Sequence, residues 1–386
     1  MTARPIHFCL LSDQLIPNLL PVVNPVTRPA KVVFLVTPRM AREKDRLARL
    51  RQFVEKKCAV AFEDFSAFDY TEIRDIIRTL IDRYRPEGEV VLNATGGTKI
   101  MSLGALDVFR EEGLASLYVD SENGQFIRLG PGGTEVSPIP ANIFSVNDYV
   151  TAVGFEVIGK SLPQVNALHQ AYVRFLLENA ERMQSAQAKL NYFASQISQG
   201  QPWRGDSFNL NATDLKNKRF VELAQYCHEA GFVQFSERER RLVFHSQPGW
   251  DLIRGGWLEM YLAPILKNLK KEGLVTDFAI NLEVLSPKGV KNEMDAVFTA
   301  KNRLHIIECK SGRMTGGRVN RADTVVYKLD NLRDLIGGDY GKAMLVTYWP
   351  ISEADRKRLG DNGMQIAEGV KLLDMEHRLR TWASKA

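Results

Sequence analysis

The sequence has 386 residues, of which 45% are hydrophobic and 25% are charged, with 51 basic against 46 acidic residues. This length exceeds one ordinary hydrophobic core and indicates two domains, with room for a small third. The composition is typical of a soluble globular protein and excludes global disorder, and no apolar stretch is long enough to cross a membrane. The net charge of +5 permits a polyanionic partner without requiring one.

The short apolar run from Ile6 to Leu11 follows Arg4 and so has the outline of a signal peptide. No small-residue cleavage site comes after it, which favours a first buried strand and a cytoplasmic protein. The four cysteines are scattered and have no paired metal-ligand spacing. Neither disulfides nor a structural zinc site is therefore expected.

Residues 1–150 alternate strand and helix patterns, as βα units do. Apolar runs predict strands at 7–11, 31–37, 59–62, 89–93 and 115–120, and apolar residues at helical spacing predict helices at 40–57, 71–84 and 99–112. Such alternation favours a mostly parallel sheet covered by helices on both faces. The predicted fold class is α/β, with a Rossmann-like domain at residues 1–150.

The pattern changes after residue 150. A long helix is predicted at 165–197, a loop at 198–207, a further helix at 214–232 and a strand at 241–244. Residues 151–250 therefore predict a helical linking region, with a winged-helix-like module as an open option.

Residues 251–386 predict a second α/β domain. Helices are expected at 257–271, 324–335 and 353–359, the last one before the tail, and strands at 275–285, 292–298, 303–310 and 343–348. A tight turn at Lys301 and Asn302 joins two of these strands.

These two joined strands carry three charged residues that the pattern brings together. Asp295 lies in the first strand, and Glu308 and Lys310 lie two residues apart in the second. Residues two apart in a strand project from the same face, and the tight turn places Asp295 beside Glu308. Three converging charges are costly unless they bind something. The alternative is a solvated strand face, which such a short motif also permits.

Two carboxylates suit a hard divalent cation, so Asp295 and Glu308 are the predicted metal ligands, for Mn²⁺ or Mg²⁺. Such a cation lowers the pKa of a bound water and stabilises charge on phosphoryl oxygens. Lys310 can position the attacking water or stabilise the developing negative charge. The predicted chemistry is phosphodiester hydrolysis.

This arrangement resembles the PD-(D/E)xK restriction-endonuclease-like family, with Asp295, Glu308 and Lys310 at the motif positions. Glu259, in the preceding predicted helix, matches the acidic residue that such nucleases often carry on their first core helix. The sequence departs from the family in having no proline before Asp295, a position that varies. The resemblance implies that residues 251–386 form a nuclease whose catalytic residues are these four.

Several neighbours of the motif carry separate expectations. Glu293 shares a strand face with Asp295 but is expected to be solvated, and His305 is expected to be structural. Lys328 is a candidate phosphate contact. A Gly-rich stretch covers residues 311–320, and the candidate nucleic-acid contacts in or beside it are Arg313, Arg318 and Arg321. The alternative interpretation of this stretch is an ordinary solvated loop.

A second constellation lies in the N-terminal domain, where a predicted strand passes into a helix through Asn93-Ala-Thr-Gly-Gly-Thr-Lys99. Glycines let backbone N–H groups approach a phosphate, and a helix N-terminus favours an anion. The run is neither a Walker A loop nor a GxGxxG fingerprint, and by itself it is also compatible with a capped turn. Loops at 12–18 and 37–39 follow two other strands, and in a doubly wound sheet such loops meet in one crevice.

The two motifs Asn-x-Thr-Gly-Gly-Thr-Lys and Ser-Asp-Gln-x-Ile-Pro-Asn resemble those of the CRISPR-associated Rossmann-fold (CARF) sensor domain. The order of a CARF domain before a PD-(D/E)xK domain is similar to that of the cyclic-oligoadenylate-activated ancillary nucleases of type III CRISPR defence. This resemblance implies a homodimer that binds cyclic tetra-adenylate across its two-fold axis, and it alone favours four adenosines over six. The implied contacts are Ser12, Gln14, Asn18, Thr37, Arg39, Thr95, Gly96, Gly97, Thr98 and Lys99.

The leading prediction is an endonuclease that cleaves DNA, RNA or both when cyclic tetra-adenylate binds. One alternative is a non-catalytic regulator in which the sensor controls a winged-helix DNA-binding module. A second is an enzyme that degrades the messenger in the N-terminal pocket, and a third is a constitutive restriction enzyme. The regulator would leave Asp295, Glu308 and Lys310 without a purpose, and residues 160–250 show no strongly basic recognition helix.

Overall fold

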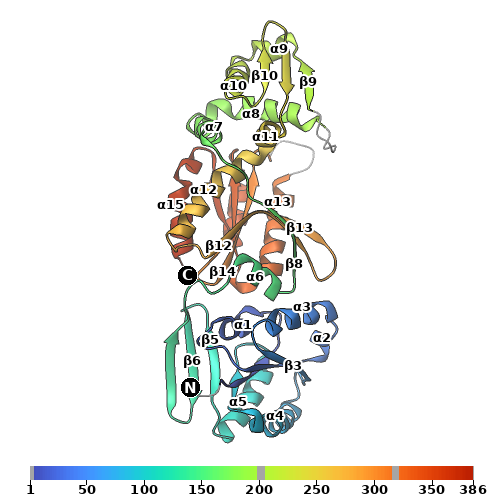
Figure 1. The fold of residues 1–386 in the computed structure, drawn as a ribbon, viewed down its shortest axis with the longest axis vertical. Helices are drawn as coiled ribbons and strands as arrows, with labels where there is room; N and C mark the ends of the chain where they lie inside the picture. The colour runs from blue at the N-terminus through green and yellow to red at the C-terminus, as the bar shows by residue number, and fades with distance from the viewer. Residues whose placement is uncertain (1–3, 198–204, 315–320, 386) are drawn as a thin grey trace.

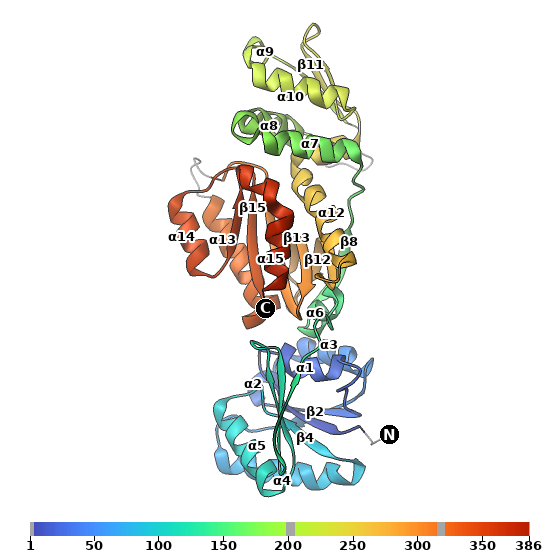
Figure 2. The same cartoon turned by 90° about the vertical axis from the view of Figure 1, so that its left-hand side faces the viewer.

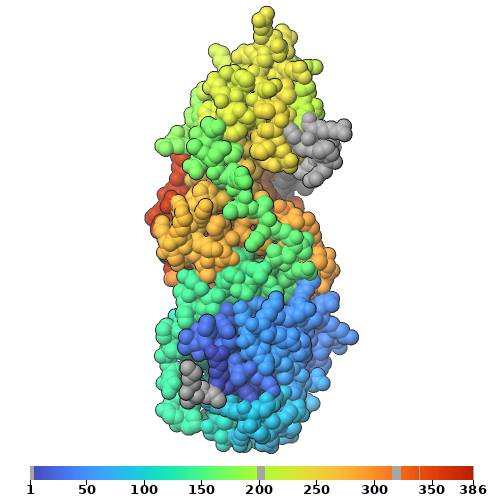
Figure 3. Space-filling model, in the orientation of Figure 1, coloured from blue at the N-terminus to red at the C-terminus, as the bar shows by residue number. Residues whose placement is uncertain are grey.

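The computed structural model describes residues 4–197, 205–314 and 321–385. Three bodies are stacked along the long axis, and their order in space differs from their order in the sequence (Figure 1). The N-terminal lobe lies at one end, the C-terminal lobe lies in the middle, and a module built from the middle of the chain lies at the far end. The same stacking is visible in the perpendicular view (Figure 2) and on the molecular surface (Figure 3).

The N-terminal lobe is built on a seven-stranded sheet of order β3-β2-β1-β4-β5-β6-β7. Its first five strands are parallel: β1 (Ile6–Leu10), β2 (Lys31–Val36), β3 (Ala59–Asp64), β4 (Val90–Asn93) and β5 (Ser116–Asp120). The predicted Rossmann-like parallel sheet is thus confirmed. The antiparallel hairpin of β6 (Gln125–Gly130) and β7 (Gly133–Pro138) extends it and was not predicted.

Helices cover both faces of this sheet. The helices are α1 (Ile16–Val23), α2 (Pro38–Ala41), α3 (Lys44–Glu55), α4 (Tyr70–Tyr84), α5 (Lys99–Glu111) and α6 (Val146–Ala152). Successive side chains of β1 alternate between the faces, so Phe8 packs with α4 and α5 while Cys9 packs with α1, α3 and α6. The helix expected at 40–57 is divided at Arg42 and Glu43 into α2 and α3.

The C-terminal lobe contains a six-stranded sheet of order β16-β15-β14-β13-β12-β8. Its strands are β8 (Glu156–Ser161), β12 (Asp277–Leu285), β13 (Lys291–Ala300), β14 (Arg303–Lys310), β15 (Lys342–Thr347) and β16 (Gln365–Glu368). The face with α12 (Trp257–Lys271) and α15 (Met375–Ser384) lies opposite the face with α13 (Arg321–Leu332) and α14 (Glu353–Asp361). The expectation of a tail after residue 359 is wrong, because β16 and α15 complete this lobe.

The middle module contains helices beside a three-stranded antiparallel sheet of order β10-β11-β9. Its elements are α7 (Ala167–Glu178), α8 (Ala180–Ser195), β9 (Asp206–Asn209), α9 (Ala212–Lys216), α10 (Lys218–Glu229), β10 (Gln234–Ser236), β11 (Arg241–Phe244) and α11 (Gln247–Asp251). The single helix expected at 165–197 is broken at Asn179, whose backbone leaves the helical region. Asn217 similarly divides the helix expected at 214–232, because its side chain caps α10.

The three bodies share their hydrophobic cores. One cluster joins α7, α8 and α10 of the middle module to α12 and β13, and another joins α1 and α6 of the N-terminal lobe to β12 and to the segment after α13. Arg49 of α3 also crosses the junction and donates to the carbonyl of Leu285 at 3.0 Å. None of the helices in the described ranges is long and apolar enough to span a membrane.

Candidate active site and candidate ligand pocket

The first candidate site lies where β13 and β14 part. Their antiparallel pairing ends at Ala296 and Ile307, so Asp295 and Glu308 are the next residues outward on each strand. The carboxylate of Asp295 takes the place of the missing ladder partner, since its Oδ2 accepts the backbone N–H of Cys309 at 2.7 Å. This bond fixes Asp295 beside β14, as the spacing predicted.

Two lysines converge on Glu308, which is 1% exposed. The Nζ of Lys310 lies 2.7 Å from Glu308 Oε1 and 3.5 Å from Asp295 Oδ2. Lys328 of α13 approaches the same carboxylate, with its Nζ 3.1 Å from Oε1 and 3.3 Å from Oε2. From the sequence, Lys328 was a candidate phosphate contact only. In the structure it is part of the cluster, because it contacts Glu308.

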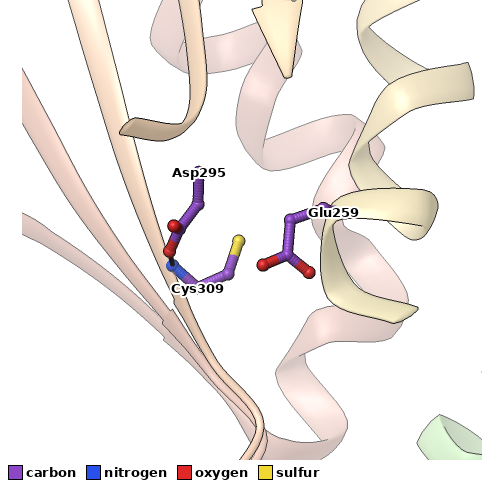
Figure 4. A group of neighbouring side chains, drawn as sticks. All are labelled: Glu259, Asp295 and Cys309. Carbon is purple, nitrogen blue, oxygen red and sulfur yellow. Dashed lines mark hydrogen bonds between the residues drawn. The ribbon is translucent and has the colours of Figure 1, made fainter. Parts of the chain in front are cut away.

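Glu259 reaches the same place from the opposite face of the sheet, on the first turn of α12. One ligand atom each from Glu259, Asp295 and Cys309 lie within 4.8 Å of one another. Figure 4 shows the Cys309 thiol pointing towards the Glu259 carboxylate while Asp295 lies against the Cys309 backbone. Nothing in the apolar strand pattern around Cys309 signals this position.

The electrostatics of the cluster follow from burial and mutual repulsion. Burial, followed by the charge of Asp295, raises the pKa of Glu259 to about 8. Burial and the charge of Glu308 also raise the pKa of Asp295. Burial opposes the charge on Lys310, yet Asp295 and Glu308 outweigh it and raise the Lys310 pKa. If all three acids were ionised, they would outnumber the two lysines, so the raised pKa values mark a region short of positive charge.

The cluster fits a hard divalent cation. The Glu259 Oε2 atom is buried and has no hydrogen-bond partner among the described residues. Carboxylates that repel one another and leave an oxygen unpaired are stabilised by a cation among them. Oxygen ligands favour Mg²⁺ or Mn²⁺ over softer metals, and the protonated thiol of Cys309, whose pKa burial raises well above its usual value, adds little to that set.

The neighbours of the motif separate into structural and exposed residues. His305 is 1% exposed and stacks on Phe298 with ring centroids 4.4 Å apart, so it is structural. Glu293 is exposed, as expected. The guanidinium of Arg313 lies 5.7 Å from the ring centroid of Trp349. Arg318 and the side chain of Arg321 lie outside the described part of the chain.

The middle module holds the segments that flank this cluster. On α8, the side-chain amide of Gln187 donates to the carbonyl of Ile253, and that of Asn191 donates to the carbonyl of Arg254, just before α12. Gln184 donates to the carbonyl of Tyr348 at 2.6 Å, directly after β15. The module therefore orients the helix that carries Glu259.

The second candidate site lies at the carboxyl ends of β1 and β4. Gly96 is buried against the loop after β1, and a Cβ atom there would overlap the carbonyl of Leu10 and crowd Asn18 and Ser12. Only glycine permits this approach. The predicted loops at 12–18 and 93–99 are thus in contact.

Most of the predicted polar contacts in these loops already have internal partners. Asn18 is fully buried and donates to the carbonyl of Leu10 at 2.9 Å. Thr95 donates to Asn93 Oδ1 at 2.7 Å and accepts the backbone N–H of Val119 at 2.8 Å. Thr98 caps α5 and donates to the carbonyl of Ala67, and buried Thr37 caps α2.

The remaining predicted contacts differ in accessibility. Lys99 is exposed at the start of α5 and forms no ion pair with any described residue. Arg39 is exposed and pairs with Asp13. Ser12 and Gly97 are partly exposed. Gln14 faces the other lobe, where a Cβ atom on Gly338 would overlap its side-chain amide.

Comparison with known protein families matches both halves of the chain. Residues 6–149 match the Card1 CARF domain, and residues 249–386 match the Card1-like endonuclease domain. The chain is a CARF–endonuclease fusion. Its N-terminal lobe is the CARF domain and its C-terminal lobe is the endonuclease domain, as the sequence motifs predicted. The comparison with curated proteins gave no match.

Solved structures agree with this assignment. Can2 from Sulfobacillus thermosulfidooxidans, in complex with cyclic tetra-adenylate, is 26% identical with a TM-score of 0.78, over 98% of this chain and 97% of that one. Protein VC1899 from Vibrio cholerae is 24% identical with a TM-score of 0.86, over 99% and 98%. A type III CRISPR defence DNA nuclease activated by cyclic oligoadenylate is 17% identical with a TM-score of 0.53, over 90% and 46%. The last two likenesses concern the fold alone.

Proposed function

We propose that this protein is a metal-dependent endonuclease that cyclic tetra-adenylate activates in type III CRISPR antiviral defence. The observation that carries the nuclease assignment is the convergence of Lys310 on two carboxylates, 2.7 Å from Glu308 and 3.5 Å from Asp295, inside an endonuclease domain. The activator assignment rests on the CARF domain and on the similarity to Can2, which binds cyclic tetra-adenylate. Such an enzyme would act in the cytoplasm on DNA, RNA or both.

The catalytic roles follow from the geometry of the cluster. Asp295 and Glu308 would hold Mn²⁺ or Mg²⁺, with Glu259 as a further acidic group at the same point. The bound cation would supply a water of lowered pKa and would neutralise charge on the phosphoryl oxygens. Lys310 keeps its proton beside two carboxylates, so it can orient the attacking water or stabilise the developing negative charge by donating hydrogen bonds.

The activator would bind at the loops after β1, β2 and β4 of the CARF domain. Backbone N–H groups at 96–97 and the N-terminus of α5 favour a phosphate there, and Lys99 and Arg39 add positive charge. The internal bonds of Thr95, Thr98 and Asn18 hold the loops in shape for this contact. Ser12, Gln14, Thr37, Gly96 and Gly97 complete the proposed ligand-binding set.

A homodimer is supported by an apolar groove next to these loops. The groove has a volume of about 380 Å³ and begins at Ala94 and Ser102, beside the loop at 95–98. Its wall includes Leu103, which is 55% exposed, and Tyr118, which is 46% exposed. Exposed apolar surface of this kind is typical of an interface. A two-fold axis here would bring two copies of the loops together around a ligand with its own internal symmetry.

A physical route from the activator to the nuclease site is supported by one contact between the domains. Gln14, in the loop after β1, lies against Gly338, which follows the helical turn Arg333–Gly337 at the end of α13. Tyr149 of α6 also donates to the carbonyl of Gly337 at 3.2 Å. Lys328 on α13 contacts both oxygens of Glu308. A shift of the Gln14 loop would therefore bias the position of a lysine that competes with a cation for Glu308.

The functional division that we propose is a sensor at 1–150, a helical and winged-helix-like linking module at 151–250 and a nuclease at 251–386, with β8 of the linking segment paired into the nuclease sheet. The helices beside the small sheet β10-β11-β9 support the winged-helix-like description.

The experiment that tests this function is a cleavage assay with the full chain. Supercoiled plasmid, single-stranded DNA and single-stranded RNA are each incubated with Mn²⁺, Mg²⁺ or chelator, with and without cyclic tetra-adenylate. Cleavage that needs both cation and messenger supports the proposal and identifies the substrate. Cleavage without messenger removes the regulatory part, and binding of messenger without any cleavage favours the non-catalytic regulator.

A further inference from the structure

A partly open cavity of about 220 Å³ lies where the CARF domain meets the endonuclease domain. The CARF domain contributes α1, the turn between β5 and β6, and the segment after β7. The endonuclease domain contributes the turn between β13 and β14, together with Tyr340. Asn302 in that turn links the endonuclease domain to the segment after β7. Its side chain donates to the carbonyl of Pro140 and accepts a hydrogen bond from the N–H of Ile143.

The cavity is lined by an arginine, Arg303, whose charge no carboxylate among the described residues balances. Arg303 is 8% exposed, and its guanidinium donates to the backbone carbonyl of Ser121 at 3.2 Å. No carboxylate of the described residues lies within ion-pair distance of it. Both acids beside Ser121 leave Arg303 unpaired: Asp120 hydrogen bonds to Asn123, and Glu122 is exposed. A buried cation is costly unless an anion accompanies it, and the described residues supply none for Arg303.

Other groups at this junction point to the same conclusion. Lys342 begins the strand beside β14, and burial together with Arg303 and Arg333 lowers its pKa. Lys301 lines the cavity and donates to a backbone carbonyl, that of Ser384. The buried hydroxyl of Ser121, also in the lining, has no hydrogen-bond partner among the described residues. Positive charge and an unused donor therefore face one space.

We propose that this cavity binds a small phosphate-bearing anion that bridges the CARF and endonuclease domains. Arg303 would supply the planar guanidinium fork that suits phosphate oxygens, with Ser121 and Lys301 as further donors. Ile16 and Leu20 form an apolar wall that can accept a nucleobase. The cavity accommodates a phosphate monoester as large as a nucleoside monophosphate, and it is too small for a cyclic tetranucleotide. Because both domains line it, the ligand stabilises their observed arrangement.

The test is a titration of the full chain by calorimetry and thermal unfolding, with chelator present and ionic strength held constant. The probes are inorganic phosphate, adenosine monophosphate and uncharged adenosine. We expect saturable binding of both phosphate compounds, with a rise in the unfolding temperature, and no binding of adenosine. Arg303→Met should weaken the binding at least tenfold. Arg49→Met is the matched control, because Arg49 also crosses the domain junction but pairs with Glu156 and does not line the cavity.

Two further variants keep the outcome decisive. Ser121→Ala removes only the unused hydroxyl and should weaken phosphate binding several-fold, even where Arg303→Met folds poorly. Lys99→Ala removes a charge at the activator loops, and the phosphate binding that Arg303→Met weakens should persist in this variant. The proposal is overturned if saturable phosphate binding is absent. It is also overturned if the Arg303→Met and Ser121→Ala variants both bind phosphate as tightly as the wild type, or if Lys99→Ala alone abolishes the binding. None of these readouts depends on nuclease activity or on cyclic tetra-adenylate.

Discussion

The two candidate sites of this chain are built in opposite ways. At the nuclease cluster, charged side chains converge on one another, and one oxygen of Glu259 has no hydrogen-bond partner among the described residues. At the CARF loops, the predicted polar side chains of Asn18, Thr95 and Thr98 are already bonded within the domain. In the proposed function, the first site would hold its ligand with charged side chains, and the second would hold its ligand with a backbone that these internal bonds shape.

This difference decides how substitutions should act. Removing a charge from the nuclease cluster should abolish chemistry while leaving the distant CARF loops intact, because those side chains contact one another and not the CARF loops. Removing a hydroxyl from the CARF loops should disturb the loop itself as well as its ligand. Lys99 is the exception at the second site, since it is exposed and has no ion pair among the described residues.

The largest expected effect is at Glu308 and Lys310. Glu308→Ala removes a proposed metal ligand, and Lys310→Ala removes the group that contacts both carboxylates. Each should lower the cleavage rate by roughly 10²–10³-fold or more, with binding of cyclic tetra-adenylate unchanged. Rates are measured in the cleavage assay and binding by calorimetry. Glu293→Ala, an exposed acid on β13, is the matched control, and wild-type cleavage by Glu308→Ala would falsify the site assignment.

The next effect tests whether the two sites communicate through Gln14. Gly338→Ala would place a methyl group against the Gln14 amide and should reduce activation within the roughly 5- to 150-fold range of allosteric coupling. Messenger binding, measured separately, should change much less. Gly289→Ala is the matched control, because Gly289 also has a positive φ but has no atom near the new methyl group. Equal activation of both variants would remove Gln14 from the route.

A smaller effect separates charge from loop structure at the CARF site. Lys99→Ala should weaken messenger binding about tenfold, the size of one charge-assisted hydrogen bond, without changing thermal stability. Thr98→Ala should weaken binding too, but it also removes the cap of α5 and the bond to Ala67, at a cost of about 1 kcal/mol in stability. Calorimetry and thermal unfolding are measured on both. A stability loss in Lys99→Ala, or none in Thr98→Ala, contradicts the distinction.

The sequence predicted the architecture well where local pattern decides it. Strand β14 and helix α12 were predicted with their observed bounds, because apolar periodicity and the Lys301–Asn302 turn mark them. Elements that depend on tertiary contacts were missed. The strand β8 follows the CARF domain in sequence, yet it pairs with β12 in the endonuclease sheet. The four-residue strand β16 similarly depends on its pairing with β15.

The candidate sites, like the fold, were predictable where local pattern decides them. The strand period brought Glu308 and Lys310 to one face, and a family resemblance added Glu259. No spacing rule connects Lys328 to Glu308, which is 20 residues away on a helix, or Gln14 to Gly338 in another domain. Sequence patterns report which residues share an element, whereas these contacts depend on how elements pack.

The smallest effect concerns the acidity of Glu259, whose pKa is raised to about 8 by burial and by Asp295. In the absence of metal the folded protein keeps this proton above the pH at which the unfolded chain, with an ordinary pKa near 4.5, releases it. The proton therefore stabilises the fold fully below about pH 4.5, and that contribution is lost as the pH rises through about 8. Glu259→Gln, which cannot ionise, should lose less stability over this interval.

The measurement is thermal unfolding of both proteins in chelator from pH 5 to pH 9. The unfolding temperature of the variant should rise relative to that of the wild type as the pH rises, by roughly 2–4 °C for each kcal/mol of stability. Added Mn²⁺ should make the wild type unfold at a higher temperature than the variant at high pH, because a cation favours the ionised carboxylate that only the wild type has. Parallel pH profiles with and without Mn²⁺ would mean that Glu259 neither titrates in this range nor faces the metal. The description of the nuclease site as a cluster of converging charged side chains would then hold only for Asp295 and Glu308 among its acids.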